Sequence, residues 1–354
     1  MKILVSAIEH SANIHLKEVV KRLPPETELV GIFDRELGEP MEDLRSLAVM
    51  GITDALRKLP FFFRLADRMV ELASGADKVL LIDGSGFNLP LAKKIKKRYP
   101  HKEIVYYILP QAWAWRRYRI KTLERTVDRL ASILPFEKRY YSPSAPIDYV
   151  GHPLLDEISR FKEAPPETIR TIAFLPGSRR SEIRTLMPLF RKLRHRLGES
   201  LDARVVIPPI FSPKEIDELY GDLNGFRQEH DTHRTLFESD FAFVCSGTAT
   251  LEAALIGTPL VLAYRAKPLD YFLASRLVRI EYAGLANLFS LDFQGRAMHP
   301  ELLQDDLTID NLLREYEAFD RKRYAEDVQK LRRYLRHGSA ENVARLLSIR
   351  GEKG

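Results

Sequence analysis

The sequence predicts an α/β protein built from two successive doubly wound domains, each with a mostly parallel sheet. The first observation is that short apolar runs alternate with amphipathic stretches of helical period through the first half. The second is that the same alternation resumes in the second half. The third is a polar, proline-bearing stretch at residues 160–168, which is typical of an interdomain linker. The length of 354 residues agrees with about two domains.

The individual elements follow from the same patterns. The apolar runs of the first half predict strands at residues 2–7, 28–34, 78–83, 103–108, 132–134 and 147–150. The stretches between them predict helices near residues 15–22, 56–72, 89–98 and 118–125. Strands of the second half are expected at residues 171–175, 203–208, 241–244 and 260–264. From residue 308 onward the chain is charged and helical in pattern, so we expect three parts: residues 1–164, 168–307 and a tail at 308–354.

Composition limits the class of protein. Charged residues make up 29% and apolar residues 45%, which is typical of a globular chain. A net charge of +6 favours anionic partners such as nucleotides, phosphates or acidic lipid surfaces. The single cysteine excludes an internal disulfide and fits a reducing compartment. The first residues enter a strand at once, unlike a signal peptide, and no apolar run approaches the ~20 residues of a membrane-spanning helix.

The tripeptide Ser246-Gly247-Thr248 joins an apolar strand to a predicted helix at residues 249–256. Such a turn directs backbone N–H groups and the positive helix end toward one point, which suits a phosphate. Glu252 follows in the first helical turn, where its carboxylate could bind a sugar hydroxyl. An ordinary strand-to-helix connection with a capping Ser or Thr explains the segment equally well.

A second candidate anion site follows the strand at residues 171–175. Gly177 and Ser178 permit a tight turn, and Arg179 and Arg180 come next. A guanidinium can bind phosphate through two parallel hydrogen bonds. The alternative is a solvated basic helix start with a serine cap. Because the Ser246–Thr248 turn lies in the same predicted domain, the two turns together favour a diphosphate site.

Two carboxylates follow strands of the first domain. Asp83 ends an apolar strand before Gly84, so it could project from the carboxyl edge of the sheet and act as a general base. Its alternative role is to cap the following turn or helix. Glu9 follows the first strand at the same edge, where a plain polar loop is the alternative. The glycines around Ser85 do not form a dinucleotide-binding motif, because Leu89 occupies the third glycine position.

No metal site is expected. The sequence contains no Asp-x-Asp clamp, Walker loop or Gly-x-Ser-x-Gly elbow. Residues 229–233 bring Glu, Asp and two His together, but without a cysteine and in a loop-like context.

Two aromatic segments are candidates for contact with lipid or acceptor. Phe61, Phe62 and Phe63 lie among arginines and a lysine, a mixture that suits a helix in a membrane interface. Core packing under an ordinary helix is the alternative. Trp113, Trp115 and Arg116 cluster after the strand at residues 103–108, where contact with a ligand or lipid and structural packing are equally plausible.

Together these segments resemble the lipid-A-disaccharide synthases, and the variants resemble the epsilonproteobacterial branch of that family. The matching motifs run in order over nearly the whole chain. They are residues 47–51 (LAVMG), 110–116 (PQAWAWR), 134–137 (LPFE), 151–153 (GHP), 175–179 (LPGSR), 246–252 (SGTATLE), 264–268 (YRAKP), 286–288 (ANL) and 300–304 (PELLQ).

The resemblance implies a GT-B fold, in which two Rossmann-like domains face a central cleft, and an inverting transfer without metal or cofactor. The implied donor is UDP-2,3-diacylglucosamine, the acceptor is 2,3-diacylglucosamine 1-phosphate, and the products are lipid A disaccharide 1-phosphate and UDP. It also implies a peripheral enzyme on the cytoplasmic face of the inner membrane, which in some members is a homodimer with exchanged C-terminal domains. No nucleic-acid partner is expected.

The resemblance also implies roles for individual residues. Asp83 matches the proposed catalytic base, and Glu9 matches an acidic residue of the first motif. The UDP-sugar is expected to bind Ser178, Arg179, Ser246, Gly247, Thr248, Glu252, Asn287, Glu301 and Gln304.

Two departures from the family pattern stand out. Ala12-Asn13 replaces the usual Gly-Asp pair after the first strand, and Gly86 replaces a second aspartate after Asp83.

Two other functions remain open from the sequence. One is another GT-B protein acting on UDP-N-acetylglucosamine, either a transferase or an epimerase. The other is a non-catalytic lipid-binding protein at the membrane surface.

Overall fold

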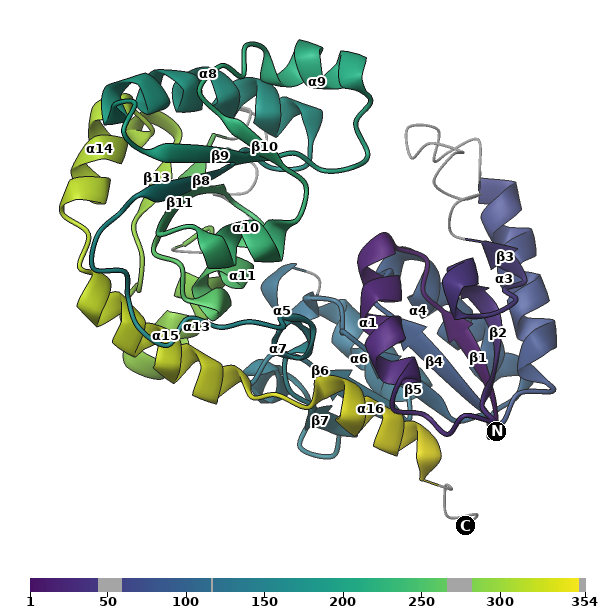
Figure 1. Cartoon of the computed structure of the whole chain (residues 1–354). Coiled ribbons are helices and arrows are strands. Elements are labelled where there is room, and N and C mark those ends of the chain that lie inside the picture. Colours follow the sequence, from purple (N-terminus) through teal and green to yellow (C-terminus); the bar gives the residue numbers. More distant parts are fainter. Residues whose placement is uncertain (44–58, 116, 266–281, 350–354) are drawn as a thin grey trace. The chain divides into compact units, whose positions relative to one another are not determined.

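The structure is a computed structural model that describes residues 1–43, 59–115, 117–265 and 282–349. The chain divides into two compact units (Figure 1). The first unit comprises Met1–Glu157 and Leu335–Gly354, and the second comprises Ile158–Tyr334. Each is a parallel sheet with helices on both faces, so the predicted fold class is confirmed.

The sheet of the first unit has seven parallel strands in the order β3-β2-β1-β4-β5-β6-β7. The strand order reverses beside β1, and sheets of this kind bind ligands at the carboxyl ends of the strands near such a point. The strands are β1 (Lys2–Ser6), β2 (Glu28–Phe33), β3 (Glu42–Asp43), β4 (Lys78–Ile82), β5 (Ile104–Tyr107), β6 (Arg129–Ser132) and β7 (Ile147–Tyr149).

Helices cover both faces of this sheet. On one face α3 (Leu59–Ala73) packs against α4 (Ser85–Arg98), which packs against α6 (Tyr118–Thr126). On the other face α1 (His10–Val20) packs against α7 (Pro153–Glu157) and α16 (Ser339–Ser348). The short helix α5 (Ala112–Trp115) follows β5 and contacts α6.

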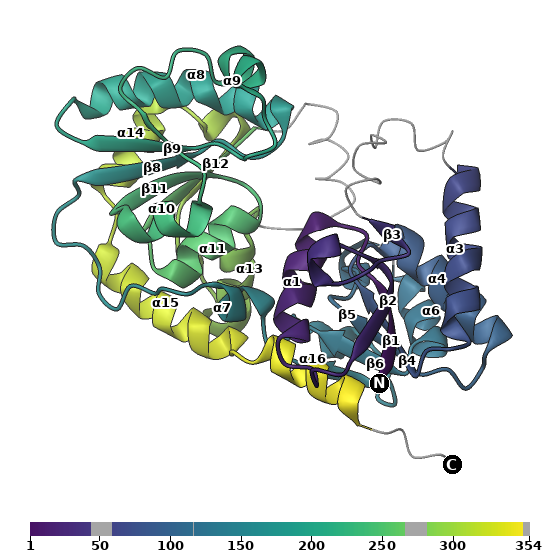
Figure 2. The same cartoon turned by 45° about the vertical axis from the view of Figure 1, so that its right-hand side comes forward.

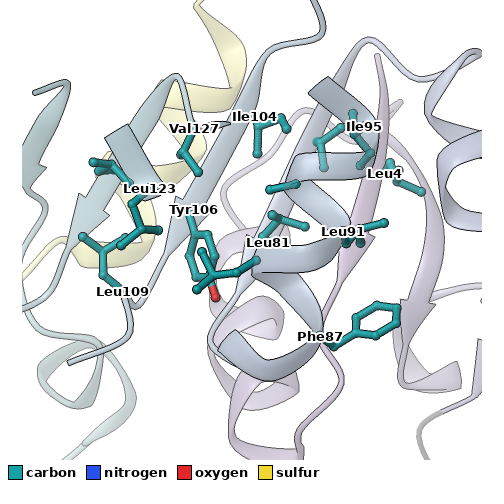
Figure 3. Packing of buried hydrophobic residues seen from close by; sticks show 14 of the residues in the cluster. Leu4, Leu81, Phe87, Leu91, Ile95, Ile104, Tyr106, Leu109, Leu123 and Val127 are labelled. Carbon is teal, nitrogen blue, oxygen red and sulfur yellow. The ribbon is translucent and has the colours of Figure 1, made fainter. Parts of the chain in front are cut away.

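Strand β4 shows why the strands read as unbroken apolar runs. Val79 and Leu81 lie in the core beneath α3 and α4. Figure 3 shows Leu81 in this core together with Leu91 and Ile95 of α4. Leu80 and Ile82 lie in the core beneath α1 and α16. Because side chains alternate between the faces of a strand and both faces are buried here, every position from Val79 to Ile82 is apolar.

The second unit has a six-stranded parallel sheet in the order β10-β9-β8-β11-β12-β13. Its strands are β8 (Thr171–Leu175), β9 (Asp202–Val206), β10 (Arg227–Glu229), β11 (Phe241–Cys245), β12 (Leu260–Tyr264) and β13 (Glu301–Leu303). Figure 1 shows α8 (Arg180–Leu197), α9 (Pro213–Tyr220) and α14 (Ile309–Glu317) on one face. The other face carries α10 (Thr232–Glu238), α11 (Thr248–Ile256) and α13 (Leu285–Gln294).

Several predicted boundaries were wrong. The strand expected at 132–134 is β6, which ends at Ser132 because the Ser132 hydroxyl bonds the amide of Leu134 and turns the chain. Helices α1 and α4 begin earlier than expected, after short connections at residues 7–9 and 83–84. The two- and three-residue edge strands β3, β10 and β13 were missed, since so few residues carry no periodic signal.

The stretch expected as a linker belongs to the second unit. The Lys162 amide donates to the Ile256 carbonyl at 2.8 Å, and the Arg321 guanidinium donates to the Pro166 carbonyl at 2.9 Å. The first stretch of the first unit therefore ends at Glu157 and not at residue 164.

The helical tail expected at residues 308–354 is divided between the units. Helix α14 and nearly all of α15 (Arg321–Leu335) lie in the second unit, whereas α16 lies in the first. Figure 2 shows α16 beside α1. Ala340, Val343, Ala344 and Leu347 recur at helical spacing and are buried in the core beneath α1.

The Gly151-His152 pair contacts residues 335–337, where the chain re-enters the first unit before α16. Gly151 has a φ of +98°, and a Cβ there would lie 3.1 Å from the carbonyl oxygens of Arg336 and His337. The His152 amide donates to the Leu335 and Arg336 carbonyls, each at 3.1 Å. Only glycine combines this backbone conformation with so close an approach.

Candidate active site

Asp83 lies at the carboxyl end of β4, directly before α4. Its φ of 49° is left-handed, which is uncommon for a residue with a side chain. The surrounding bonds hold it there: its amide donates to the Tyr107 carbonyl at 3.0 Å, and its carbonyl accepts from the Tyr106 hydroxyl at 2.6 Å. A strained residue held by its neighbours at a ligand-binding edge is typical of a functional position.

Asn88 fixes the same loop from inside α4. Its side chain is fully buried and donates to the carbonyls of Ile82, at 3.1 Å, and Asp83, at 2.9 Å. Its amide oxygen accepts from the Ser6 hydroxyl at 2.6 Å. Asn88 therefore connects the end of β4 to the end of β1 by hydrogen bonds and fixes the position of the Asp83 backbone.

The structure brings Glu9 and Asp83 together, as expected for residues after neighbouring parallel strands. Glu9 is exposed and precedes α1 without capping it by a side-chain bond. Asn13, which replaces the acidic member of the family's Gly-Asp pair, donates to the carbonyls of Ala7 and Glu9 at 2.8 and 2.9 Å. Its amide oxygen accepts from the Asp34 amide at 2.7 Å, so it holds the loop after β1.

Both carboxyl groups have a raised pKa. Burial raises the pKa of Asp83, while the Gly84 amide and the positive charge of His15 oppose that rise. Although Glu9 as a whole is exposed, its carboxyl group is partly shielded from water, and this shielding and then the negative charge of Asp83 raise its pKa. A carboxylate with a raised pKa is a stronger base than an exposed one, which suits removal of a proton from a hydroxyl.

The aromatic residues after β5 pack against the next loop. Trp113 stacks on Tyr140 with ring centroids 5.7 Å apart and meets the edge of Phe136 at 5.1 Å. Glu137 of the same loop is buried, bonds the Ser132 hydroxyl through Oε2, and has its pKa raised to about 8 by burial. The side chain of Trp115 and all of Arg116 lie outside the described residues.

The three phenylalanines at the start of α3 have different surroundings. Phe61 and Phe62 are half-buried against the core, and Phe62 packs near Phe87 with centroids 6.1 Å apart. Phe63 is 58% exposed, with the Lys94 ammonium 5.6 Å from its ring centre. Along the described ranges, no helix has both the length and the apolar content to cross a membrane.

In the second unit, Arg179 lies at the start of α8 and is held by Glu182. The guanidinium Nη1 lies 2.7 Å from Glu182 Oε1, and the Arg179 amide donates to Oε2 at 3.2 Å. Glu182 is nearly buried whereas the Arg179 side chain is 77% exposed. The hydrogen bond and the charge of Glu182 raise the pKa of Arg179 further. The guanidinium is thus anchored at one end and open to an anion at the other.

The Ser246–Thr248 turn follows β11, the strand next to β8, so both candidate anion turns lie at adjacent strand ends. Gly247 and Thr248 are exposed, and α11 begins at Thr248 with its first N–H groups at that edge. The Ser246 hydroxyl donates to the Ala283 carbonyl at 3.2 Å. Glu252 is partly exposed, with His233 Nε2 3.9 Å from its Oε1.

Of the remaining predicted residues, Asn287 and Glu301 are bonded to each other, whereas Gln304 bonds to Arg265. Asn287 is fully buried and donates to Glu301 Oε1 at 2.8 Å and to the His299 carbonyl at 2.9 Å. Glu301 also accepts from the amides of Ala283, at 2.7 Å, and Gly284, at 3.0 Å. Gln304 has a φ of 50°, and its carbonyl accepts from the Arg265 guanidinium. The bonds of Asn287 and Glu301 shape the loop that carries Ala283, the partner of Ser246.

His15 and Glu157 lie near the candidate site although no sequence motif indicates them. His15 Nδ1 is bonded to Glu157 Oε1, and the charge of His15 reaches Asp83. The two residues are 142 positions apart and belong to no local motif, so only their fold brings them together.

Comparison with known proteins places the chain in a family. A family model described as lipid-A-disaccharide synthetase matches residues 3–347. The lipid-A-disaccharide synthase of Helicobacter pylori strain J99 is 48% identical over 355 residues, covering 97% of this chain and 96% of the relative. That of Campylobacter jejuni strain RM1221 is 43% identical over 370 residues, with 98% of each chain covered. Both source organisms are epsilonproteobacteria, in agreement with the branch that the sequence variants indicate.

Solved structures share the fold at low identity. A UDP-GlcNAc 2-epimerase from Neisseria meningitidis has a TM-score of 0.61 at 11% identity, with 98% of this chain and 99% of the other covered. Acinetobacter baumannii MurG has a TM-score of 0.54 at 14% identity, with 98% of each covered. At such identities the likeness shows the GT-B fold alone, whereas the family rests on the full-length sequence matches. The chain belongs to the lipid-A-disaccharide synthase family of glycosyltransferases.

Proposed function

We propose that this chain joins UDP-2,3-diacylglucosamine to 2,3-diacylglucosamine 1-phosphate, with Asp83 as the base. The reaction is that of the family, and the observation that carries its assignment to these residues is the environment of Asp83. The carboxyl group lies at the ligand-binding edge of the sheet, its backbone is held in a strained conformation, and burial raises its pKa.

In the proposed step, Asp83 accepts the proton of the acceptor's 6-hydroxyl. The hydroxyl oxygen forms the new bond to the donor's anomeric carbon, and the bond from that carbon to the diphosphate oxygen breaks. The electron pair leaves with UDP, so negative charge grows on the diphosphate. Arg179 and the first N–H groups of α11 are suited to stabilise that charge.

The direct test measures UDP release with both acylated sugars and identifies the disaccharide by mass spectrometry. We expect release only when donor and acceptor both carry acyl chains. Conversion of UDP-N-acetylglucosamine without an acceptor would instead indicate an epimerase. Absence of any UDP release, together with binding of the acylated sugars, would indicate a lipid-binding protein.

We also propose that the first unit docks on the cytoplasmic face of the inner membrane through α3, α4 and α6. Phe63 is 58% exposed and Tyr118, at the start of α6, is 68% exposed. Cations accompany them on α3 and α4: Arg64 and Arg68 are exposed, and Lys94 is partly exposed and paired with Asp67. Exposed rings beside cations suit an interface that carries anionic lipid headgroups.

A matched pair of variants separates docking from packing. Phe63→Ser removes an exposed ring, so vesicles of anionic lipid should bind less enzyme while the melting temperature changes little. Phe62→Ser removes a ring packed near Phe87, so it should lower the melting temperature instead. Equal vesicle binding by Phe63→Ser and the unaltered protein would reject this docking face.

The homodimer expected from the family is tested by light scattering at several concentrations.

A further inference from the structure

The start of α6 carries an arginine beside the Asp83 loop for which the proposed reaction has no role. Arg119 is the second residue of α6, and its Nη1 donates to the Ser85 hydroxyl at 2.9 Å. Ser85 is the first residue of α4 and follows Asp83 and Gly84 in the chain. Because α4 and α6 pack against each other, this bond joins the start of one helix to the start of the other. Arg119 therefore lies at the sheet edge that holds the proposed base.

The charge of Arg119 is not neutralised by a carboxylate of the protein. Within the described ranges, no Asp or Glu side chain forms an ion pair with it. By contrast, Arg296 bonds both carboxylate oxygens of Asp327. A guanidinium keeps its proton in proteins, and the side chain of Arg119 is only partly exposed, so water compensates the charge incompletely. This arrangement favours an anion from outside the chain as the partner of Arg119.

Arg119 and Ser85 have hydrogen-bond donors left for such an anion. A guanidinium has five N–H donors in a planar fork, and in the described part of the chain Arg119 bonds Ser85 alone. The Ser85 hydroxyl accepts that bond and keeps its own proton for another acceptor. The space beside them is open, because Gly86 is exposed and a Cβ there would meet nothing within 4 Å. A planar fork with a neighbouring hydroxyl suits the oxygens of a phosphate.

The acceptor of the proposed reaction carries such a phosphate at C1. In a pyranose, C1 and C5 flank the ring oxygen, and C5 bears the C6 hydroxymethyl group. The 1-phosphate and the reacting 6-hydroxyl therefore lie on the same side of the sugar. Asp83 and Ser85 are two residues apart in the chain, so their Cα atoms are separated by at most about 7 Å. A phosphate bound at Arg119 and Ser85 would thus leave the 6-hydroxyl within reach of Asp83.

We propose that Arg119 and Ser85 bind the 1-phosphate of the acceptor and so select a phosphorylated acceptor. The inference rests on the proposed function, because it assigns the acceptor's phosphate to residues beside the proposed base. Asp83 and Glu9 are carboxyl groups at the same edge, and as carboxylates they repel a phosphate. A fixed cation is needed to offset that repulsion. Arg119 is a binding residue and takes no part in proton transfer.

The test compares two acceptors that differ only in this phosphate. Calorimetry without donor measures binding of 2,3-diacylglucosamine 1-phosphate and of 2,3-diacylglucosamine, both with short acyl chains. Arg119→Gln should weaken binding of the phosphorylated acceptor by about 10- to 100-fold, the usual effect of losing hydrogen bonds between charged groups, and leave the other unchanged. Arg119→Lys keeps the charge without the fork, so its loss should be smaller. Arg125→Gln removes an exposed arginine in the last turn of the same helix and should change neither.

A second pair of variants adds a charge instead of removing one. Gly86→Asp introduces a carboxylate into the open space beside Ser85, and Gly86→Asn introduces a side chain of the same shape without the charge. The position lies in the first turn of α4, where a carboxylate does not destabilise a helix. Gly86→Asp should reduce the preference for the phosphorylated acceptor, and Gly86→Asn should keep it. Equal binding by the two variants would contradict a charged ligand at this place. If Arg119→Gln does not fold, this pair decides the question alone.

Other sources of phosphate give different results. Weaker UDP binding by Arg119→Gln, with an unchanged preference between the acceptors, would assign the site to the donor's diphosphate. Weaker binding to vesicles of anionic lipid, again with an unchanged preference, would assign it to a lipid headgroup. Either result would overturn the proposal. Equal binding of both acceptors by the unaltered protein would overturn it as well.

UDP release by the unaltered protein tests the reaction separately. Release from both acylated sugars, with an unchanged acceptor preference in a folded Arg119→Gln variant, would refute this inference and leave the reaction standing. A phosphate preference that depends on Arg119, without any UDP release, would support the binding site and refute the reaction.

Discussion

Replacement of Gly177 by alanine tests whether Glu182 anchors Arg179. Gly177 has a φ of +99°, and an added Cβ would lie 2.5 Å from Glu182 Oε2 and 3.1 Å from the Cys245 sulfur. The first distance is too short for any contact, so Glu182 must move. Because Glu182 holds Arg179 by 2.7 and 3.2 Å bonds, the guanidinium should lose its fixed position.

Gly198→Ala is the matched control. Gly198 also has a positive φ, of +86°, but a Cβ there meets nothing within 4 Å. Each change should lower the unfolding free energy by roughly 1–3 kcal/mol, the cost of a strained backbone. The Arg179–Glu182 pair should add little to this loss, because Arg179 is 77% exposed and exposed ion pairs contribute about 0–1 kcal/mol. Stability alone will therefore hardly separate the two variants.

Catalysis should separate them. An Arg179 side chain that must be ordered again at each turnover costs about 0.5–1.5 kcal/mol, which corresponds to roughly a 2- to 10-fold loss in kcat/KM. We expect this loss in Gly177→Ala and not in Gly198→Ala, measured as UDP release well below both melting temperatures. Equal kcat/KM in the two variants would refute the anchoring role of Glu182.

Three further outcomes are expected. Asp83→Asn should lower turnover by roughly 10²–10⁴-fold while calorimetry shows unchanged UDP binding, and near-normal turnover would exclude Asp83 as the base. Arg179→Ala should slow UDP release more than Arg179→Lys does, and neither Mg²⁺ nor EDTA should alter the rate of the unaltered enzyme. Because burial raises the pKa of Glu137 from 4.5 to about 8, the folded state keeps a proton that the unfolded state has lost, so the unfolding free energy should fall as pH rises between these values. In Glu137→Gln, urea titrations should show an unfolding free energy that falls less between these pH values. An unchanged pH dependence would contradict the raised pKa of Glu137.

The sequence was a good guide wherever a residue follows an unbroken apolar strand. Asp83 and Glu9 were placed correctly because β4 and β1 are buried on both faces and end sharply. The two candidate anion turns, after β8 and after Cys245 of β11, lie at one sheet edge because β8 and β11 are adjacent parallel strands. In each case a local pattern fixes the position of the next residue.

The direction of a side chain could not be predicted in this way. Asn287 was expected to bind the donor, and its position at the start of α13 fits that role. Its amide nitrogen donates to the His299 carbonyl and to Glu301, contacts that depend on how the loop folds, and its binding of the donor stays a prediction. Phe62 and Phe63 are neighbours in sequence, yet one packs on the core and the other is exposed. His15 and Glu157 meet only because α1 and α7 pack together.

The return of α16 to the first unit has a consequence for synthesis. The core that contains Ile3 and Val5 also contains Val343 and Leu347, so residues that pack together are translated more than 300 positions apart. During synthesis, one face of the first sheet remains without the apolar residues of α16 until the second unit has been translated. Exposed apolar surface in that interval is the kind that chaperones bind. A released chain that ends before residue 339 should therefore retain a folded second unit but a loosened first one, and limited proteolysis of this truncated chain should cut the first unit first.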